Sequence, residues 1–520
     1  MTANTEESDD REERRSKYHE ADVVVVGAGI FGCAIAHALA SQGRSVILLE
    51  RWMKEPDRIV GELLQPGGVR ALRELGLGAC LDDIDAVPCH GYHVLYGGDE
   101  VVIPYPVVDD AGNIRPAPAP AAKPDAHGAV NGAAKRADPL RRPEGRSFHH
   151  GRFIMQLRRA CQRHPNITVV EAEATATVQG EDGPDVLGVE ARTTDPTTGQ
   201  KRPDCFFASL TIVADGYASK FRRQLLGPAA APVVRSKFYA LELRDCAFPP
   251  AGYGHVVIGS AYPVLLYQIG SRETRALIDV PLDLPAAGPA AGGVRGYIRD
   301  VVVPALPPHV RPALVAAMAD GKIPRSMPNS WLPPTPPKAR PTPPGILLMG
   351  DAANMRHPLT GGGMTVALRD AVLLSALLAP AAVPDLADRA AVARAAARFH
   401  VARRPHSVII NVLAQALYAL FAAQGRPLRA LQRGCFAYFR AGVTDGPMGL
   451  LGGLIRRPAV LAWHFFSVAF LALWLNAVDV VTAAGWAWAL FRLPLALADA
   501  VLILWTACVV FLPYLWRELR

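Results

Sequence analysis

The chain has 520 residues, of which 50% are hydrophobic and 20% charged, with a formal net charge of +8 at pH 7. This length allows about three domains, and the hydrophobic share excludes a chain that is disordered throughout. The eight cysteines are scattered without close pairs of metal-ligand spacing, which favours a reduced protein facing the cytosol and predicts no metal site.

The first elements form a βαβ unit behind a charged tail. Residues 1–20 contain seven acidic and four basic residues and no apolar run, which predicts a disordered acidic tail rather than a signal peptide or anchor. Residues 22–26 then have the apolar, β-branched pattern of a buried parallel strand, and residues 33–40 that of a helix. A second strand over residues 45–49 ends at Glu50.

Three glycines between the first strand and the helix have G-x-G-x-x-G spacing: Gly27, Gly29 and Gly32. Gly27 permits a tight turn, Gly29 lets a pyrophosphate approach the backbone, and Gly32 lets helix and strand pack closely. The diphosphate then lies at a helix N-terminus, where unpaired N–H groups favour an anion. Glu50 is placed to accept hydrogen bonds from a ribose. The unit predicts dinucleotide binding and leaves NAD and FAD as alternatives.

Two later strands also end beside acidic and glycine residues. Residues 210–214 lead into Asp215-Gly216, and residues 345–349 lead into Gly350 and Asp351. The second of these continues into a loop with three glycines, before a predicted helix over residues 365–377: Gly361, Gly362 and Gly363. Such a loop lets backbone approach a polar ligand, and Asp351 can hold a ribityl or diphosphate group. The three motifs in this order resemble flavoprotein monooxygenases, which favours FAD over NAD.

The C-terminal part contains the strongest hydrophobic signal. Residues 458–478 and 500–516 have no charged residue, and residues 400–520 hold eleven Arg against four acidic residues, so +7 of the +8 lies there. This location argues against a nucleic-acid-binding surface. A membrane-spanning helix needs about 20 apolar residues, so both stretches are marginal, and Pro513 is expected to break the second. We expect membrane association, spanning or monotopic; the alternative is a pair of buried core helices.

Longer blocks resemble the squalene monooxygenase (squalene epoxidase) family over nearly the whole chain. They run in family order over residues 55–68, 148–158, 325–328, 350–364 and 411–418. The departures are an Ala/Pro-rich stretch at 109–146, predicted to be a disordered insertion, and the lack of an N-terminal hydrophobic segment that some relatives carry. Neither departure falls on a motif.

The resemblance implies an α/β fold with a Rossmann-type FAD-binding domain of the three-motif monooxygenase type. It also implies a β-sheet substrate domain and a C-terminal helical, membrane-associated domain. The expected boundaries are 21–92, 147–235 and 340–400 for the FAD-binding domain, 93–108 and 236–339 for the substrate domain, and 401–520 for the C-terminal domain.

The resemblance also assigns site residues beyond the motifs. The positions that match FAD contacts in the family are Ile30, Phe31, Glu50, Arg51, Arg58, Leu63, Arg158, Ala174, Asp351 and Met364. Arg58 or Arg158 can act as a charge-assisted partner of the diphosphate or form a surface ion pair instead. Tyr92 and Tyr267 match positions at the substrate pocket, and Tyr92 is the candidate for orienting the site.

The implied reaction is the epoxidation of squalene to (S)-2,3-oxidosqualene in sterol biosynthesis. In the family, NADPH supplies electrons through NADPH–cytochrome P450 reductase, and O₂ adds to reduced FAD to give a flavin C4a-hydroperoxide. Its electrophilic distal oxygen is transferred to a terminal double bond. Because the alkene is the nucleophile, no side-chain nucleophile or strong base is required. An oily substrate arrives through lipid, and the resemblance implies the endoplasmic reticulum (microsomal) membrane, with the catalytic body facing the cytosol. The alternatives are another membrane-associated FAD monooxygenase acting on a different lipid or aromatic substrate, and a flavoprotein scaffold without catalysis.

Overall fold

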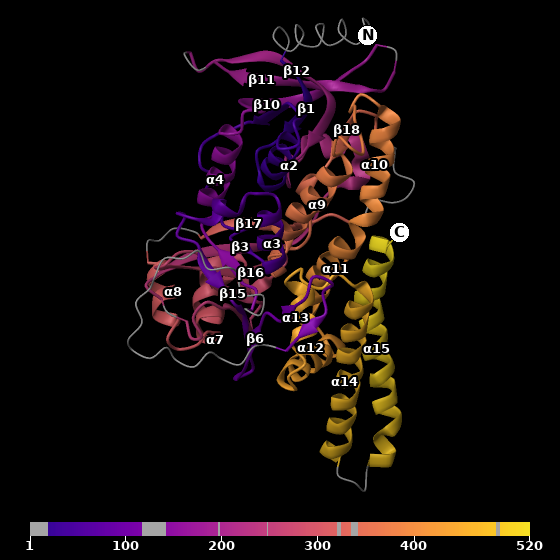
Figure 1. The fold of residues 1–520 in the computed structure, drawn as a ribbon. Coiled ribbons are helices and arrows are strands. Elements are labelled where there is room, and N and C mark those ends of the chain that lie inside the picture. Colours follow the sequence, from indigo (N-terminus) through magenta and orange to yellow (C-terminus); the bar gives the residue numbers. More distant parts are fainter. Residues whose placement is uncertain are drawn as a thin grey trace, which may run out of the picture.

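The structure is a computed structural model, and it describes residues 19–116, 142–181, 183–195, 198–246, 248–259, 261–319, 324–333, 342–484 and 489–519. All but the last two residues of the predicted acidic tail, 1–20, lie outside the described residues, as does most of the predicted insertion. The described residues form two large sheets, one above the other in Figure 1, and two small ones, with a helical C-terminal part beside them.

The first sheet has six strands among the described residues. Five of them are parallel, in the order β10 (Ile167–Gln179), β2 (Val46–Glu50), β1 (Glu20–Val26), β12 (Lys201–Val213), β18 (Ile346–Leu348). The antiparallel strand β11 (Val186–Thr194) pairs with extensions of β10 and β12. Because parallel strands end at one edge, the ends of β1, β2, β12 and β18 bring all three predicted motifs to that edge.

Helices cover both faces of this sheet. β1 is an almost continuous run of buried valines, as expected for a strand that is buried on both faces. One face packs against α2 (Ile30–Ala40), α4 (His150–Gln162), α9 (Gly363–Leu377), α3 (Pro66–Glu74) and α10 (Arg389–Ala402). On the other face, α5 (Lys220–Leu226) packs against the sheet, and buried residues of β11 belong to the same core. α9 corresponds to the helix predicted over residues 365–377, but it begins two residues earlier, at Gly363 in the glycine loop.

The second sheet has seven described strands in the order β17 (Arg325–Trp331), β13 (Val233–Arg244), β16 (Glu273–Pro281), β15 (Val264–Gln268), β14 (Gly254–Ile258), β5 (Gly91–Tyr96), β6 (Asp99–Pro104). All neighbours are antiparallel except β14 and β5. Alternate residues face opposite sides of the sheet. Val94 joins a core that includes Leu63 and residues of the C-terminal helices, and Leu95 joins the core beneath the short helices α6 (Gly293–Tyr297), α7 (Val303–Ala305) and α8 (Arg311–Ala317).

The ends of the predicted insertion are ordered, so the prediction of disorder over 109–146 was too wide. β7 (Val107–Val108) and β8 (Ile114–Arg115) form a hairpin whose Gly112 carbonyl accepts a hydrogen bond from Arg457 Nη2 at 3.0 Å. At the other end, β9 (Gly145–Ser147) pairs with both β3 (Leu63–Leu64) and β4 (Val87–Cys89). Backbone pairing orders both ends despite their polar composition; residues 117–141 lie outside the described residues.

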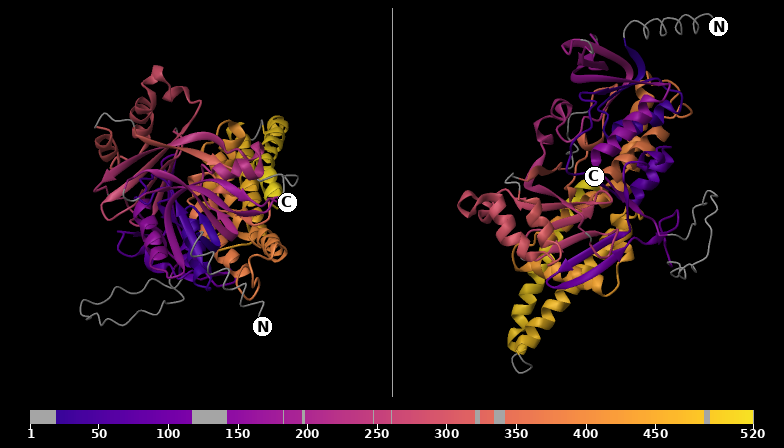
Figure 2. Two further views of the ribbon diagram at one scale, coloured as in Figure 1. Left: turned by 90° about the horizontal axis from the view of Figure 1, so that it is seen from above. Right: turned by 90° about the vertical axis from the view of Figure 1, so that its left-hand side faces the viewer.

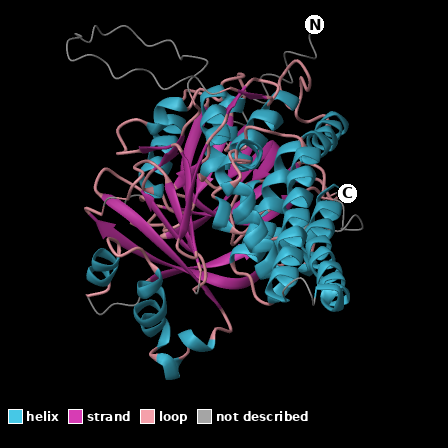
Figure 3. Ribbon diagram, turned by 90° about the horizontal axis from the view of Figure 1, so that it is seen from below, coloured by secondary structure: helices cyan, strands magenta, loops and turns pink. Residues whose placement is uncertain are grey.

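The C-terminal part consists of α11 (Arg404–Phe421), α12 (Arg426–Arg440), α13 (Asp445–Leu451), α14 (Pro458–Ala484) and α15 (Ala489–Leu519). α14 and α15 form an antiparallel pair whose tip extends beyond the body, and they stand with the other C-terminal helices to one side of the strands (Figures 2 and 3). Both helices are long and apolar enough to cross a membrane.

The expected break at Pro513 was wrong, because α15 continues to Leu519. Tyr514 packs on Trp331, and Glu518 accepts a hydrogen bond from Asn411, so tertiary contacts hold the last turns.

A buried ionic cluster joins the first sheet's helices to the C-terminal part. Asp370 on α9 is fully covered and accepts hydrogen bonds from Arg403 at 2.6 and 3.1 Å, with His406 Nε2 at 2.8 Å. Burial alone would raise the pKa of Asp370, but the charge of Arg403 and the contact with His406 hold it at about 2. The cluster therefore stabilises the protein above pH 4 and loses this effect as the pH falls toward 2.

The first prediction concerns this cluster. Asp370→Ala leaves Arg403 buried without its carboxylate, so we expect a loss of about 3–5 kcal/mol in the free energy of unfolding, measured by urea denaturation in detergent at neutral pH. Asp300→Ala removes an exposed ion pair with Arg299 (2.7 Å) and should cause no measurable change. Equal urea-denaturation midpoints for Asp370→Ala and Asp300→Ala would contradict a stabilising function of the buried cluster.

Candidate functional site

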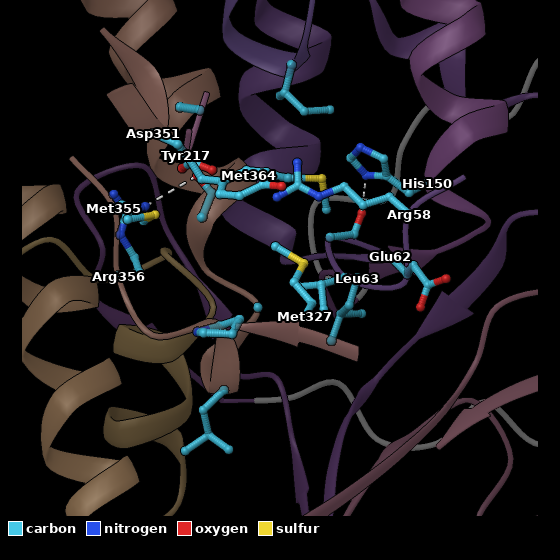
Figure 4. Close-up of a pocket in the computed structure, with 18 of the residues that line it drawn as sticks. Arg58, Glu62, Leu63, His150, Tyr217, Met327, Asp351, Met355, Arg356 and Met364 are labelled. Atoms are coloured by element: carbon cyan, nitrogen blue, oxygen red, sulfur yellow. Dashed lines mark hydrogen bonds between the residues drawn. The ribbon is translucent and has the colours of Figure 1, made fainter. Parts of the chain in front are cut away.

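A cavity of about 210 Å³ lies between the two sheets, at the edge where the three motifs end. The first sheet contributes the N-terminus of α2, the end of β12 and the loop from Gly350 to α9. The second contributes β5, β14, β15, β16 and β17. In Figure 4, Arg58, Tyr217 and Asp351 converge at the upper side of the cavity, whereas Leu63 and Met327 lie below them. The cavity therefore has a polar side and an apolar side.

The glycine motif forms a tight turn into α2. Gly27 has a positive φ of 102°, and a Cβ there would lie 2.5 Å from the Ala214 carbonyl oxygen. A Cβ on Gly32 would lie 1.8 Å from the Gly27 oxygen, so this glycine lets the helix pack on the turn. Gly29 lines the cavity, and a Cβ there meets nothing within 4 Å. The open space at Gly29 and the free N–H groups of α2 fit a diphosphate.

Glu50 and Arg158 stabilise this turn through Ala28, although neither side chain lines the cavity. Glu50 Oε2 accepts a hydrogen bond from the Ala28 N–H at 2.9 Å and lies 3.1 Å from Arg158 Nη2. Arg158, which is buried, also donates to the carbonyls of Ala28, Trp52 and Lys54. The guanidinium is thus bonded to protein on several sides. Arg158 therefore positions the backbone around Ala28, Trp52 and Lys54.

Unpartnered polar atoms lie on the polar side. Arg58 packs over the Tyr217 ring at 5.2 Å, and its buried Nε has no hydrogen-bond partner within the described chain. Nearby, His150 Nδ1 lies 2.8 Å from the Gly61 carbonyl oxygen. Burial, with the charge of Arg58, lowers the pKa of His150 to about 3, so this ring is neutral at physiological pH. Asp351 also lines the cavity. These groups fit the phosphates and polar edge of FAD.

The hydroxyl group of Tyr92 is held by the side-chain amide of Gln65. Gln65 Nε2 donates to the Tyr92 hydroxyl at 2.7 Å and to the Thr360 carbonyl at 2.8 Å, and its Oε1 accepts from Tyr105 at 2.5 Å. Burial raises the pKa of Tyr92 well above its usual value, so the phenol stays protonated. Because Thr360 precedes Gly361, which has a positive φ of 60° and lines the cavity, Gln65 links Tyr92 to the glycine loop.

Tyr267 is held by a buried ion pair. Its hydroxyl donates to Glu62 Oε2 at 3.1 Å, and Glu62, 1% exposed, accepts from Arg275 Nη2 at 2.8 Å and Nε at 3.0 Å. Glu62 precedes β3, whereas Arg275 and Tyr267 belong to the second sheet. The set therefore joins the two sides of the cavity. The apolar side consists of side chains such as Val256, Leu265, Leu277, Met327 and Leu359.

The predicted site residues divide into two groups. Those that line the cavity are Gly29, Ile30, Phe31, Arg58, Leu63, Tyr92, Tyr267, Gly350, Asp351, Gly361, Gly363 and Met364. Those that do not are Gly27, Gly32, Glu50, Arg51, Arg158, Ala174, Asp215 and Gly362. Arg51 is exposed and packs over Trp52, and Ala174 is buried on the other face of the first sheet. Asp215 accepts a hydrogen bond from the Lys220 N–H at the start of α5.

Several polar residues at the site were not predicted, among them Glu62, Gln65, Arg356 and Arg275. Glu62 and Gln65 lie in the block 55–68, and Arg356 lies in the block 350–364, so those blocks carried a signal. Arg356 is buried, donates to the carbonyls of Gly363 and Asn354, and shapes the glycine loop. Arg275 has no signal in the sequence, because a strand arginine becomes recognisable only through its distant partner.

Comparisons with known proteins agree with this geometry. A family model described as squalene epoxidase matches residues 207–490, and one described as FAD binding domain matches residues 20–232. A squalene epoxidase of Gibberella zeae is 60% identical over 505 residues, covering 97% of each chain. A squalene monooxygenase of Mus musculus is 38% identical over 506 residues, covering 96% of this chain and 78% of the mouse protein.

Solved structures share the fold. The p-nitrophenol 4-monooxygenase of Pseudomonas putida has a TM-score of 0.58 at 18% identity, covering 84% of this chain and 98% of that one. A myxobacterial FAD-dependent chondrochloren halogenase has a TM-score of 0.55 at 15% identity, covering 86% and 97%. The α/β fold with an FAD-binding domain, expected from the sequence, is confirmed.

The second prediction tests the open side of the glycine turn. Gly29 has φ −89°, which alanine adopts freely, so Gly29→Ala should leave the stability of the flavin-free protein unchanged. Its methyl group would occupy the space of the diphosphate, and we expect FAD binding to weaken by about tenfold or more, measured by flavin fluorescence. Gly259→Ala, at an exposed position, should bind FAD normally. Normal FAD affinity of Gly29→Ala would contradict the assignment.

Proposed function

The chain belongs to the squalene epoxidase family and is an FAD-dependent monooxygenase that epoxidises squalene, and we propose that the reaction takes place in the cavity between its two sheets. The observation that carries this proposal is the division of the cavity into a polar side and an apolar side. A polar cofactor and a hydrocarbon each find a matching surface, and they meet where the sides join.

Several residues would hold FAD on the polar side. We assign the diphosphate to Gly29 and the N-terminus of α2, with Arg58 as the cationic partner, and the ribose to Glu50. Asp351 and the glycine loop up to Met364 would contact the flavin half. When bound, FAD supplies the redox chemistry: the reaction takes up O₂, two electrons and two protons and delivers one oxygen atom to the alkene and one to water.

The chain itself positions the alkene and excludes water. The apolar side chains of β14 to β17 would surround the hydrocarbon, and Tyr92 and Tyr267 line the same cavity. Both tyrosines are neutral, since burial raises the pKa of each. Glu62 is paired with Arg275, and burial lowers the pKa of His150 to about 3, so His150 is a weak base and neither residue acts as a strong one. This suits a reaction in which the alkene is the nucleophile.

We assign the electrons to NADPH, delivered by a separate reductase such as NADPH–cytochrome P450 reductase. The test supplies flavin-loaded protein with squalene, NADPH, O₂ and that reductase, and detects 2,3-oxidosqualene by mass spectrometry. We expect product with the reductase and none without it. Flavin-loaded protein that yields no product with all components would overturn the activity, whereas product without the reductase would overturn only the electron source.

The third prediction concerns the Gln65–Tyr92 contact. Tyr92→Phe and Gln65→Leu should each lower kcat by about tenfold, because both release the same orienting contact at the glycine loop. The double variant should then be no slower than either single variant. Tyr297→Phe, a buried tyrosine outside the cavity, should keep the original kcat. Losses that multiply in the double variant would show that the two residues act independently.

Membrane association follows from one face of the helical pair. Exposed large apolar side chains recur every three to seven residues, at Trp463, Phe470 and Trp474 on α14 and at Val501, Trp505, Val509, Leu512 and Trp516 on α15. These spacings place each set on one side of its helix, and tryptophans suit the lipid–water boundary. We propose that this face lies in the bilayer and admits squalene to the enzyme from lipid.

We further propose that the helical pair lies in one leaflet and does not cross the membrane. α12 packs along α14 and α15, and its Arg433 and Arg426 pair with Asp479 and Asp499 near the tip. A transmembrane arrangement would carry these charges into hydrocarbon at high cost. The Arg-rich flanks favour a cytosolic catalytic body on the endoplasmic reticulum membrane.

The fourth prediction tests this face. The double variant Trp474→Asp and Trp505→Asp replaces two side chains that are each 67% exposed, so folding should be preserved and binding to phosphatidylcholine vesicles lost. Trp52→Asp, at a residue that is 61% exposed on the body, should bind vesicles normally. Flotation assays with flavin-loaded protein measure both. Vesicle binding by the double variant would contradict the assignment.

A further inference from the structure

A second cavity, of about 270 Å³, lies between α12 and α14, away from the site described above. We call it the α12–α14 cavity. α12 contributes Arg426, Arg429 and Arg433, which are spaced so that they share one face of the helix. α14 contributes Asn476. The cavity is therefore basic, and it opens beside the membrane-facing helices.

The charges of this cavity are incompletely balanced. Arg426 pairs with Asp499 and Arg433 pairs with Asp479. Arg429 is exposed; its Nε makes a 3.5 Å contact with the Gly425 carbonyl, and no described carboxylate lies within ion-pair distance of it. Three guanidinium groups thus face two carboxylates, which leaves a net positive charge with free donors on Arg429.

The surroundings indicate where an anion would come from. Trp474 lies two residues before Asn476, and Phe470 lies one turn earlier, and both are largely exposed. A ligand with a phosphate in the cavity and acyl chains along these rings would match both surfaces. Basic pockets beside membrane helices are the usual sites for anionic headgroups.

We propose that the α12–α14 cavity binds the phosphate of an anionic phospholipid headgroup, with Arg429 as its principal donor. A planar guanidinium matches two phosphate oxygens, and Asn476 adds a neutral polar contact. The proposal rests on the membrane docking proposed above and adds a preference for lipid type. Free phosphate offers the same chemistry without acyl chains, so the experiment separates the two sources.

The experiment compares flotation of the flavin-loaded full chain on phosphatidylcholine vesicles with and without phosphatidic acid. We expect Arg429→Gln to lower the preference for anionic vesicles about fivefold. Asn476→Leu, which leaves the charge unchanged, should lower it as well. Arg440→Gln removes a charge from the same helix outside the cavity, where Arg440 pairs with Asp99 at 2.7 Å, and should keep the preference.

Three results would overturn the proposal. An equal loss in Arg440→Gln and Arg429→Gln would show diffuse attraction by the helix, and binding of inorganic phosphate without any preference for anionic vesicles would assign the cavity to a soluble ion. Titration with short-chain phosphatidic acid tests the cavity without a bilayer, where equal affinity of the original chain and Arg429→Gln would also overturn it. Failure to bind neutral vesicles would contradict the membrane docking alone.

Discussion

The buried ion pair between Glu62 and Arg275 is the contact on which the site depends. It joins the segment before β3 to β16 of the second sheet, 213 residues away, and its Glu62 also accepts a hydrogen bond from Tyr267, which lines the cavity. Buried ion pairs are weak sources of stability, because desolvation offsets much of their attraction. Their geometry is nevertheless specific, and here it determines how the polar and apolar sides of the cavity face each other.

The C-terminal part also contributes contacts to the site. The Tyr418 ring of α11 stacks on His357 at 4.0 Å, directly before the glycine loop. Asn411 donates to Asn354 in the same loop at 3.0 Å and to Glu518 at the end of α15 at 2.9 Å. Contacts therefore run from the apolar helices through α11 to the loop assigned to the flavin. The helical pair and the cavity between the two sheets therefore form one packed unit.

The local parts of this architecture were predictable from sequence, and the long-range parts were not. Gly27, Gly29 and Gly32 can be recognised in the sequence, because tight turns and close packing require glycine at fixed spacing. Arg275 could not be found, since its function comes from a carboxylate in a distant segment. The helix break predicted at Pro513 was wrong. Proline disfavours a helix locally, but the contacts of Tyr514 and Glu518 preserve it here. The edges of the insertion were also misjudged, since backbone pairing outweighs polar composition there.

The central claim is that squalene reaches the boundary between the two sheets. Photolabelling tests it most directly, with flavin-loaded protein and a squalene analogue that carries a photoreactive group at one end, followed by mapping of the labelled peptides. The account predicts labels on β15 and β17, around Leu265 and Met327, and their suppression by excess squalene. Suppressible labels confined to α14 and α15, with none on the second sheet, would contradict it.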